Sequence, residues 1–317
     1  MMQKLNVAVL GCGFWGKNHA RVLSELECCN LVAVADIKEE RARTIGEKYH
    51  VNWYTDPIKI LERKDIEFVS ICTPTITHAQ LALETIKTGK HVLVEKPMTN
   101  TIEEAKEVIK KADKEGVHVM VGFIERFNPA VRKAEELIEK GEIGDIVLAS
   151  SKRVSRWPER IGDVGVIKDL AIHDVDLICF LFQDNVKQVY AVVGSLAHKY
   201  EDYANIVLRF KNGKSAFIEA NWLTPRKIRR LIVTGTEGIL QVEYINQEVM
   251  VENDKMAYQP FFPYDEPLKL ELDYFVRSLL RGEKPIPSGE DGLRALTICE
   301  AALKSGRTSS PIDLSFS

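Results

Sequence analysis

The chain has 317 residues and a formal net charge of −3 at pH 7; 45% of its residues are hydrophobic and 28% are charged. This length predicts two domains of ordinary globular composition. A net charge so close to zero, without a polybasic run, argues against nucleic acid or a membrane surface as a partner. No apolar run reaches the ~20 residues that a membrane-spanning helix needs.

The six cysteines are scattered along the chain and include no CxxC pair. In a chain of this size, such usage is typical of reduced thiols and not of a disulfide framework or a zinc site. The N-terminal residues lack the long apolar core of a signal peptide. We therefore expect a soluble cytoplasmic protein.

The first part of the chain alternates short apolar runs with amphipathic helical patterns. The runs that predict strands are 4–11, 30–37, 68–74, 91–97 and 117–123, and the patterns that predict helices are 15–26, 39–50, 77–89 and 101–116. Near-continuous apolar strands separated by amphipathic helices indicate a parallel sheet covered on both faces, with right-handed crossovers. We assign residues 1–122 to a doubly wound Rossmann domain of the α/β class.

The pattern changes after about residue 123, where helical patterns flank a strand-like segment at 146–155. Six strand-like segments then follow one another, at 186–195, 203–210, 214–222, 229–236, 238–244 and 247–253. Consecutive strands joined by tight turns indicate a mostly antiparallel sheet. We assign residues 123–317 to an α+β domain with a large open sheet, and expect that the last helix can return to the first domain.

The first motif is GCGFWG, which follows the first strand and opens the first helix. Gly11 allows a tight turn, Gly13 lets the backbone approach a pyrophosphate, and Gly16 lets the helix pack closely on the strand. The helix N-terminus adds free N–H groups and a partial positive charge. The other residues of this turn that we expect to contact a dinucleotide are Cys12, Phe14 and Trp15.

Asp36 lies twenty residues after Gly16, at the end of the second predicted strand. An acidic residue there accepts hydrogen bonds from the adenosine ribose and repels a 2′-phosphate, which favours NAD as the cofactor. Arg41 and Arg43 are close enough in sequence to meet a 2′-phosphate, so NADP is the alternative. For the motif as a whole, the alternative is a glycine-rich turn followed by an aspartate that caps the next helix.

The segment CTPTITH supplies a second group of candidate cofactor contacts. Thr73 and Pro74 end the third predicted strand at its carboxyl edge, where ligands bind in doubly wound sheets. His78 falls on the first turn of the following helix. The alternative is a plain strand end with a threonine cap.

The tripeptide EKP ends the fourth predicted strand at the same edge. The ammonium group of Lys96 can polarise a carbonyl or hydroxyl oxygen there and stabilise an alkoxide. Glu95 can contact the ribose or hold Lys96 in place, and Pro97 fixes the chain at the strand exit. The alternative is a surface ion pair.

The segment DLAIHDVD carries the candidate chemistry of the second domain. Asp169, His173 and Asp176 are spaced four and three residues apart, so they share one face of a helix. A histidine that titrates near neutrality suits proton removal from an alcohol, and Asp169 can orient its ring. The alternatives are a packed histidine beside a helix-terminal aspartate, or a metal site; we find no third ligand cluster and predict no metal.

Together these segments resemble the glucose–fructose oxidoreductase / inositol dehydrogenase (Gfo/Idh/MocA) family of NAD(P)-dependent sugar oxidoreductases. The resemblance covers nearly the whole chain and rests on GCGFWG, CTPT with His78, EKP, DLAIHDVD and the closing EPLKLELDYF. It implies a catalytic lysine at Lys96 and a catalytic pair, Asp169 with His173. It also implies association into a homodimer or homotetramer through the open sheet.

The segment GFIERFNPAV, residues 122–131, resembles the matching segment of UDP-N-acetylglucosamine 3-dehydrogenases. Arg126 and Asn128 are its candidate contacts to a sugar or its phosphates. Guanidinium groups suit a diphosphate and an indole can stack on a base or sugar. The candidates of this kind after the first strand of the second domain are Arg153, Arg156, Trp157 and Arg160. The alternative is ordinary surface charge.

We therefore expect an NAD-dependent enzyme that oxidises a sugar hydroxyl, with C3 of a UDP-N-acetylhexosamine as the leading substrate position. Oxidation of a free polyol such as an inositol is the alternative, although GDVGVIKDLAIH is poorer in glycine than is usual in inositol-type relatives. A catalytically silent nucleotide sensor on the same fold is an alternative of another class.

Overall fold

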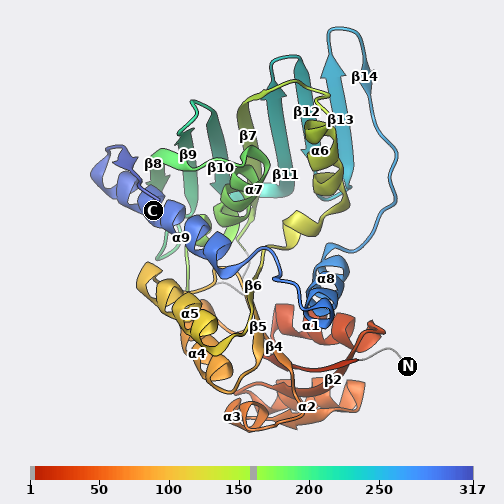
Figure 1. Ribbon diagram of the computed structural model, residues 1–317. Coiled ribbons are helices and arrows are strands. Elements are labelled where there is room, and N and C mark those ends of the chain that lie inside the picture. The colour runs from red at the N-terminus through yellow and green to blue at the C-terminus, as the bar shows by residue number, and fades with distance from the viewer. Residues whose placement is uncertain (1–3, 158–162, 317) are drawn as a thin grey trace. The chain divides into compact units, whose positions relative to one another are not determined.

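The computed structural model describes residues 4–157 and 163–316. The chain divides into two compact units (Figure 1). Unit 1 comprises residues 1–123 and 268–293, and unit 2 comprises residues 124–267 and 294–317. The sequence boundary at 122/123 lies one residue from this division, but 268–293 belongs to unit 1 and not to the second domain.

Unit 1 is built on a six-stranded sheet in the order β3-β2-β1-β4-β5-β6, in which every pairing is parallel. The strands are β1 (Leu5–Leu10), β2 (Cys29–Ala35), β3 (Asn52–Tyr54), β4 (Phe68–Ile71), β5 (His91–Glu95) and β6 (Val119–Gly122). All residues of β4 and β6 are buried, as expected for strands covered on both faces. The doubly wound parallel sheet predicted from the sequence is confirmed.

The helices of unit 1 lie on both faces of this sheet (Figure 1). They are α1 (Phe14–Glu25), α2 (Glu39–Tyr49), α3 (Ile58–Leu61), α4 (His78–Lys87), α5 (Ile102–Glu115) and α8 (Pro267–Arg281). Strand order reverses between β1 and β4, and right-handed crossovers on either side of that point place the helices on opposite faces. The carboxyl ends of β1 and β4 thus flank the point where such sheets bind ligands. The sequence did not predict the short β3 and α3.

Unit 2 is built on a nine-stranded sheet in the order β14-β13-β12-β11-β7-β10-β9-β8-β15. The strands are β7 (Ile146–Arg156), β8 (Val186–Gly194), β9 (Tyr203–Phe210), β10 (Ser215–Asn221), β11 (Leu223–Gly235), β12 (Gly238–Glu243), β13 (Glu248–Asn253), β14 (Ala257–Tyr258) and β15 (Ile312–Asp313). Among the strands of residues 124–157 and 163–316, only β7 and β10 pair in parallel, so the predicted large, mostly antiparallel sheet is confirmed.

The helices of unit 2 are α6 (Pro129–Glu139), α7 (Ile172–Phe182) and most of α9 (Gly289–Thr308). A short π-helical segment, Ile167–Ala171, precedes α7. All residues of α7 except Phe180 are buried, so this helix lies in the core of the unit and is not amphipathic. Any charged group on α7 must therefore have partners inside the protein.

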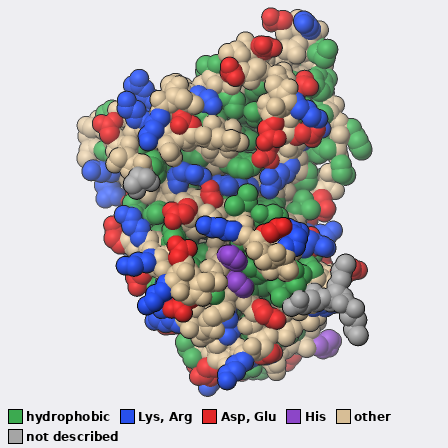
Figure 2. Space-filling model, viewed as in Figure 1, with side chains coloured by type: hydrophobic (Ala, Val, Ile, Leu, Met, Phe, Trp, Pro, Cys, Tyr) green, Lys and Arg blue, Asp and Glu red, His purple; other side chains and the backbone are tan. Residues whose placement is uncertain are grey.

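Within the described residues, no helix is long and apolar enough to cross a membrane. Figure 2 shows that basic and acidic side chains are interspersed over the visible face, with no extended surface of one sign. This distribution agrees with the small net charge.

Candidate functional site

In the glycine turn after β1, the backbone passes so close to other backbone atoms at two positions that no side chain fits there. Gly11 has φ +88°, and a Cβ there would lie 2.7 Å from the carbonyl oxygen of Cys72. A Cβ at Gly16 would lie 1.6 Å from the carbonyl oxygen of Gly11. The fold of unit 1 therefore requires glycine at both positions.

Gly13 differs, because the fold does not require it. Its φ is −76°, and the nearest atom to a Cβ at this position would be Nη1 of Arg41, 3.9 Å away. The space beside this backbone is thus left open at the N-terminus of α1, where the first turn carries no acidic side chain. An open backbone and a helix N-terminus are what a pyrophosphate needs, so these residues fit a dinucleotide.

Asp36 lies directly after β2 and is tied to the glycine turn. Its Oδ2 accepts from the backbone N–H of Cys12 at 2.8 Å, and its Oδ1 accepts from the backbone N–H of Lys38 at 2.8 Å. Burial raises the pKa of the Cys12 thiol to about 12, and the Asp36 carboxylate adds to this effect, so the thiol stays uncharged. The carboxylate is therefore held beside the glycine turn, as expected of a residue that bonds the adenosine ribose.

His78 connects the ends of β4 and β5. Its Nε2 lies 2.8 Å from the carbonyl oxygen of Thr73, and its Nδ1 lies 2.9 Å from the carbonyl oxygen of Pro97. The side chain is 1% exposed. The structure thus places His78 as a brace between two loops at the carboxyl edge, while Pro74 is exposed on the same edge.

Lys96 follows β5 at this edge and is half-buried. Its backbone N–H donates to Oε2 of Glu95 at 3.2 Å, and Oε1 of Glu95 lies 3.0 Å from Nε2 of His19 on α1. Glu95 is 8% exposed. Glu95 thus contacts both His19 and the Lys96 backbone, and its support of Lys96 stays a prediction.

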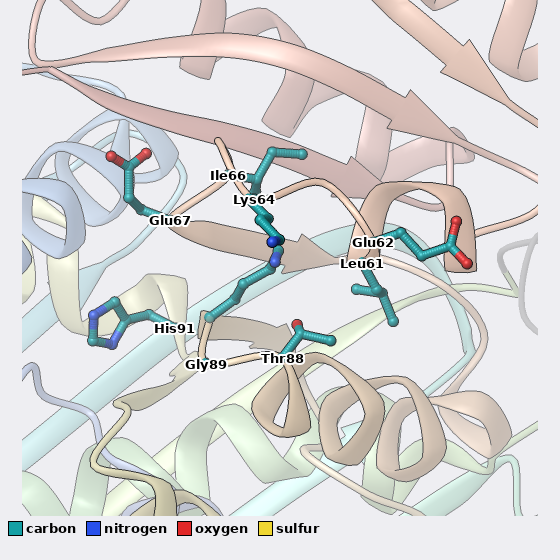
Figure 3. A pocket seen from close by; sticks show the side chains of 9 residues that line it. Leu61, Glu62, Lys64, Ile66, Glu67, Thr88, Gly89 and His91 are labelled. Carbon is teal, nitrogen blue, oxygen red and sulfur yellow. The ribbon is translucent and has the colours of Figure 1, made fainter.

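A hollow of about 510 Å³ lies at the other edge of the sheet (Figure 3). Its lining comes from the turn before β4, with Lys64 and Glu67, from the turn before β5, with Thr88, and from His91, the first residue of β5. These turns precede the strands, so the hollow lies at their amino ends. It is therefore separate from the carboxyl edge that carries the candidate site.

In unit 2, Asp169 lies in the π-helical segment and His173 lies in the first turn of α7. Their residues are 4% and 8% exposed, so both are nearly enclosed. π-Helical turns inside α-helices occur frequently at functional sites. In the described residues, no group of three or more His, Cys, Asp or Glu side chains could hold a metal ion.

Asp176, which the sequence placed on the same face as His173, has another partner. Its two carboxylate oxygens accept from Nε and Nη2 of Arg126, at 2.7 and 2.6 Å. Arg126 is 4% exposed and also stacks on Phe180. This bidentate pair neutralises one charge of α7 and engages an arginine proposed for a diphosphate.

Arg153 belongs to a second buried network. Its Nε donates to Oδ2 of Asp174 at 2.6 Å and its Nη1 donates to Oε1 of Glu125 at 2.8 Å. Arg229 lies 3.4 Å from the same Glu125 oxygen. Although burial opposes the charge of Glu125, Arg153 and Arg229 lower the pKa of its carboxyl overall. Arg153 is 1% exposed, so its charge is used inside the unit.

The remaining substrate candidates have different surroundings. Asn128 is 2% exposed and caps α6, since its Oδ1 accepts from the backbone N–H of Ala130 at 3.0 Å. Arg156 is exposed, and Trp157 stacks on His198 with ring centroids 3.4 Å apart. Arg160 lies outside the described residues. Among these candidates, Arg156 is the arginine that the structure describes on the surface.

Two family models match the chain. Residues 5–123 match the oxidoreductase family with an NAD-binding Rossmann fold, and residues 131–241 match the GFO/IDH/MocA C-terminal domain. The chain belongs to the GFO/IDH/MocA oxidoreductase family. It is therefore an oxidoreductase that binds NAD, as predicted from the glycine turn and Asp36.

Curated relatives and solved structures resemble the chain over nearly its whole length. It is 31% identical to the myo-inositol 2-dehydrogenase of Thermotoga maritima over 95% of this chain and 96% of the relative. It is 32% identical to an inositol 2-dehydrogenase of Rhizobium meliloti over 94% of this chain and 95% of the relative. A UDP-N-acetylglucosamine 3-dehydrogenase structure from Acidithiobacillus ferrooxidans has a TM-score of 0.89 at 24% identity, covering 97% and 99% of the two chains, and at that identity shows the shared fold alone.

Sequence reasoning about this family member missed the partners of its candidate residues. His19 and Glu271 in unit 1, and Glu125 and Arg229 in unit 2, were not singled out. A signal existed for two of them: His19 shares the buried face of α1 with Gly16, and Glu271 shares the buried face of α8 with Leu268 and Leu272. An ionisable residue on an apolar helix face must be paired or neutral.

We predict that Gly13→Ala keeps the fold and weakens NAD binding about tenfold or more, because the methyl group occupies the open space beside the turn. Thermal unfolding and NAD titration measure the two effects. Gly16→Ala is the matched control and is expected to lower the Tm, since its Cβ would overlap the Gly11 carbonyl. Wild-type NAD affinity in Gly13→Ala would contradict the assignment of this turn.

We predict that Arg153→Met lowers the free energy of unfolding by about 3–5 kcal/mol, because Glu125 and Asp174 would lose a buried counter-charge. Urea denaturation measures the change. Arg156→Met, at an exposed arginine, is the matched control and should shift the value by less than about 0.5 kcal/mol. Equal stability of both variants would show that the network is not needed for folding.

Proposed function

We propose that the protein oxidises a ring hydroxyl of a free cyclitol or related polyol to a ketone, with NAD as the oxidant. The observation that carries this proposal is the identity of 31–32% to two inositol 2-dehydrogenases over 94–95% of the chain. The glycine turn, Asp36 and Lys96 on one sheet edge support a site for the cofactor and the reacting hydroxyl.

Oxidation of an alcohol removes a proton from the oxygen and a hydride from the carbon. Bound NAD supplies the hydride acceptor. We assign the oxygen chemistry to this chain's own residues. His173 accepts the hydroxyl proton, Asp169 orients the imidazole, and the Lys96 ammonium stabilises the charge that develops on the oxygen.

A UDP-N-acetylhexosamine is the second candidate substrate. It is supported by the resemblance of residues 122–131 to UDP-N-acetylglucosamine 3-dehydrogenases. Against it, the guanidinium groups of Arg126 and Arg153 are already bound to buried carboxylates. A diphosphate would need to compete with those ion pairs or to use Arg156.

We also propose that a second copy of the chain covers the outer face of the sheet in unit 2. Tyr190, Val207 and Phe217 are exposed apolar side chains at neighbouring positions across β8, β9 and β10. A contiguous apolar surface on a sheet is typical of a protein–protein interface. The family resemblance, which implies a homodimer or homotetramer, supports the same surface.

We predict that the purified protein forms NADH with myo- or scyllo-inositol and not with UDP-N-acetylglucosamine. Cofactor reduction measured across both substrate classes, with NAD and NADP in parallel, tests this. NAD should be preferred, since Asp36 repels a 2′-phosphate. Activity restricted to the nucleotide sugar would reject the cyclitol, and tight NAD binding without turnover on any sugar would favour the silent sensor.

We predict that Lys96→Met and His173→Ala each lower kcat by about 10²-fold or more, since each removes a group assigned to the reacting oxygen. The Kd for NAD should stay within about threefold of the wild type. Steady-state kinetics and NAD titration measure both. Lys87→Met, on an exposed lysine of α4, is the control. Near-wild-type turnover in either site variant would remove that residue from the mechanism.

A further inference from the structure

A cluster of buried titratable side chains lies beneath Lys96 in unit 1. His19 comes from α1, Glu95 from β5 and Glu271 from α8. His19 and Glu271 are 0% exposed, and Glu95 is 8% exposed. The proposed oxidation does not use any of these three groups directly, so their burial needs another explanation.

His19 is fixed at both ring nitrogens. Its Nδ1 lies 2.8 Å from Oγ of Ser70, and its Nε2 lies 3.0 Å from Oε1 of Glu95. Ser70 is itself buried, and its Oγ lies 3.6 Å from the Cys72 sulfur. An ionised carboxylate only accepts hydrogen bonds, so Nε2 must carry the proton of the contact with Glu95.

The Glu95 carboxylate connects His19 to the backbone of Lys96. While Oε1 faces His19, Oε2 accepts from the backbone N–H of Lys96 at 3.2 Å. A Cβ at Gly122 on β6 would lie 3.2 Å from the same Oε2, so the neighbouring strand leaves this carboxylate little room to move. The position of the Lys96 backbone thus depends on a carboxylate that His19 holds.

Glu271 brings a second carboxyl group to the cluster. In the part of the chain that the structure describes, neither of its buried oxygens has a hydrogen-bond partner. Burial raises the pKa of Glu271 well above its usual range, and the Glu95 charge adds to this effect while His19 opposes it. Two neighbouring buried carboxyl groups cannot both ionise at low cost, so the one without donors keeps its proton.

The neighbours of His19 favour its charged form. Burial opposes a charged imidazole, but Cys72 and Glu95 act in the other direction and raise the pKa of His19 overall. Lys96 itself is half-buried at the rim.

We propose that His19 and Glu271 are positioning residues for Lys96. His19 holds the Glu95 carboxylate, Glu95 holds the Lys96 backbone, and Glu271 remains an uncharged acid so that one carboxylate faces the imidazole. This inference rests on the proposed role of Lys96 in the oxidation.

A double-mutant cycle tests the connection between His19 and Lys96. His19→Leu should lower kcat about tenfold or more in the wild-type background, but less than about twofold in the Lys96→Met background, because coupled residues are non-additive. His19→Gln, whose amide can still donate to Glu95, should recover most of the loss. The Kd for NAD should change little, since the glycine turn is untouched.

Controls separate this inference from the proposed function. His91→Leu and His91→Gln change a histidine at the opposite end of β5 and should leave kcat unaltered. If Lys96→Met keeps wild-type turnover, the proposed role of Lys96 fails. If Lys96→Met loses turnover as predicted but His19→Leu lowers kcat by the same factor in both backgrounds, the role of Lys96 stands and the positioning role is overturned.

Folding of each variant is checked by its Tm and by its stoichiometry of NAD binding. If His19→Leu does not fold, His19→Asn replaces it in the cycle. The shorter asparagine amide is directed toward Ser70 and does not reach Glu95, so it should lose turnover where glutamine keeps it. Equal turnover of the asparagine and glutamine variants would overturn the inference.

Glu271→Gln tests the uncharged acid independently of activity. A folded-state pKa above the unfolded value means that wild-type stability is lost as pH rises through the interval between the two values. Glutamine does not titrate. The unfolding constant of the wild type, divided by that of Glu271→Gln, should therefore rise as the pH is raised above about 4.3, the usual pKa of a glutamate, by up to about tenfold per pH unit. A ratio independent of pH would show that Glu271 is ionised in the fold.

Discussion

The close approach of α1 to the turn after β1 is the constraint on which the candidate site of unit 1 depends. Since Gly16 has no side chain, the first turn of α1 can lie against the carbonyl of Gly11. This contact directs the helix N-terminus to the place where a pyrophosphate fits. It also carries His19, one turn further along α1, to Ser70 and Glu95. A single backbone contact therefore sets both the cofactor turn and the support beneath Lys96.

In unit 2, buried charges are neutralised by ion pairs between different elements. Its central helix, α7, is buried almost throughout, yet it carries Asp174 and Asp176. Each aspartate is matched by an arginine from another element, Arg153 from β7 and Arg126 from the segment after β6. Buried pairs contribute little net stability compared with apolar packing, but they disfavour any arrangement that separates them. The pairs thus determine how α7 lies on its sheet, and with it the position of His173.

Much of the fold followed from the sequence because its signals are local. Apolar runs of strand length and the glycine spacing identify the parallel sheet, and turns such as KNGK separate the strands of unit 2. The roles of the arginines did not follow. Arg153 and Arg156 lie three residues apart on β7, but one is enclosed by Asp174 and Glu125 while the other is exposed. An odd spacing on a strand directs the two side chains to opposite faces of the sheet, so strand alternation contains that difference. Which carboxylates enclose Arg153 depends on what distant segments bring near, and spacing along one strand does not contain it.

The return of residues 268–293 to unit 1 bears on how the protein is made. The chain leaves this unit at residue 123 and supplies α8 only after most of unit 2 has been synthesised. Until then Phe68 lacks Phe275, whose ring lies 5.1 Å away in the finished unit, and the groups around Glu95 lack the cover of α8. A ribosome-bound chain that has emerged only to residue 123 therefore holds a Rossmann sheet with an open side. The cofactor domain, first in the sequence, completes its core late.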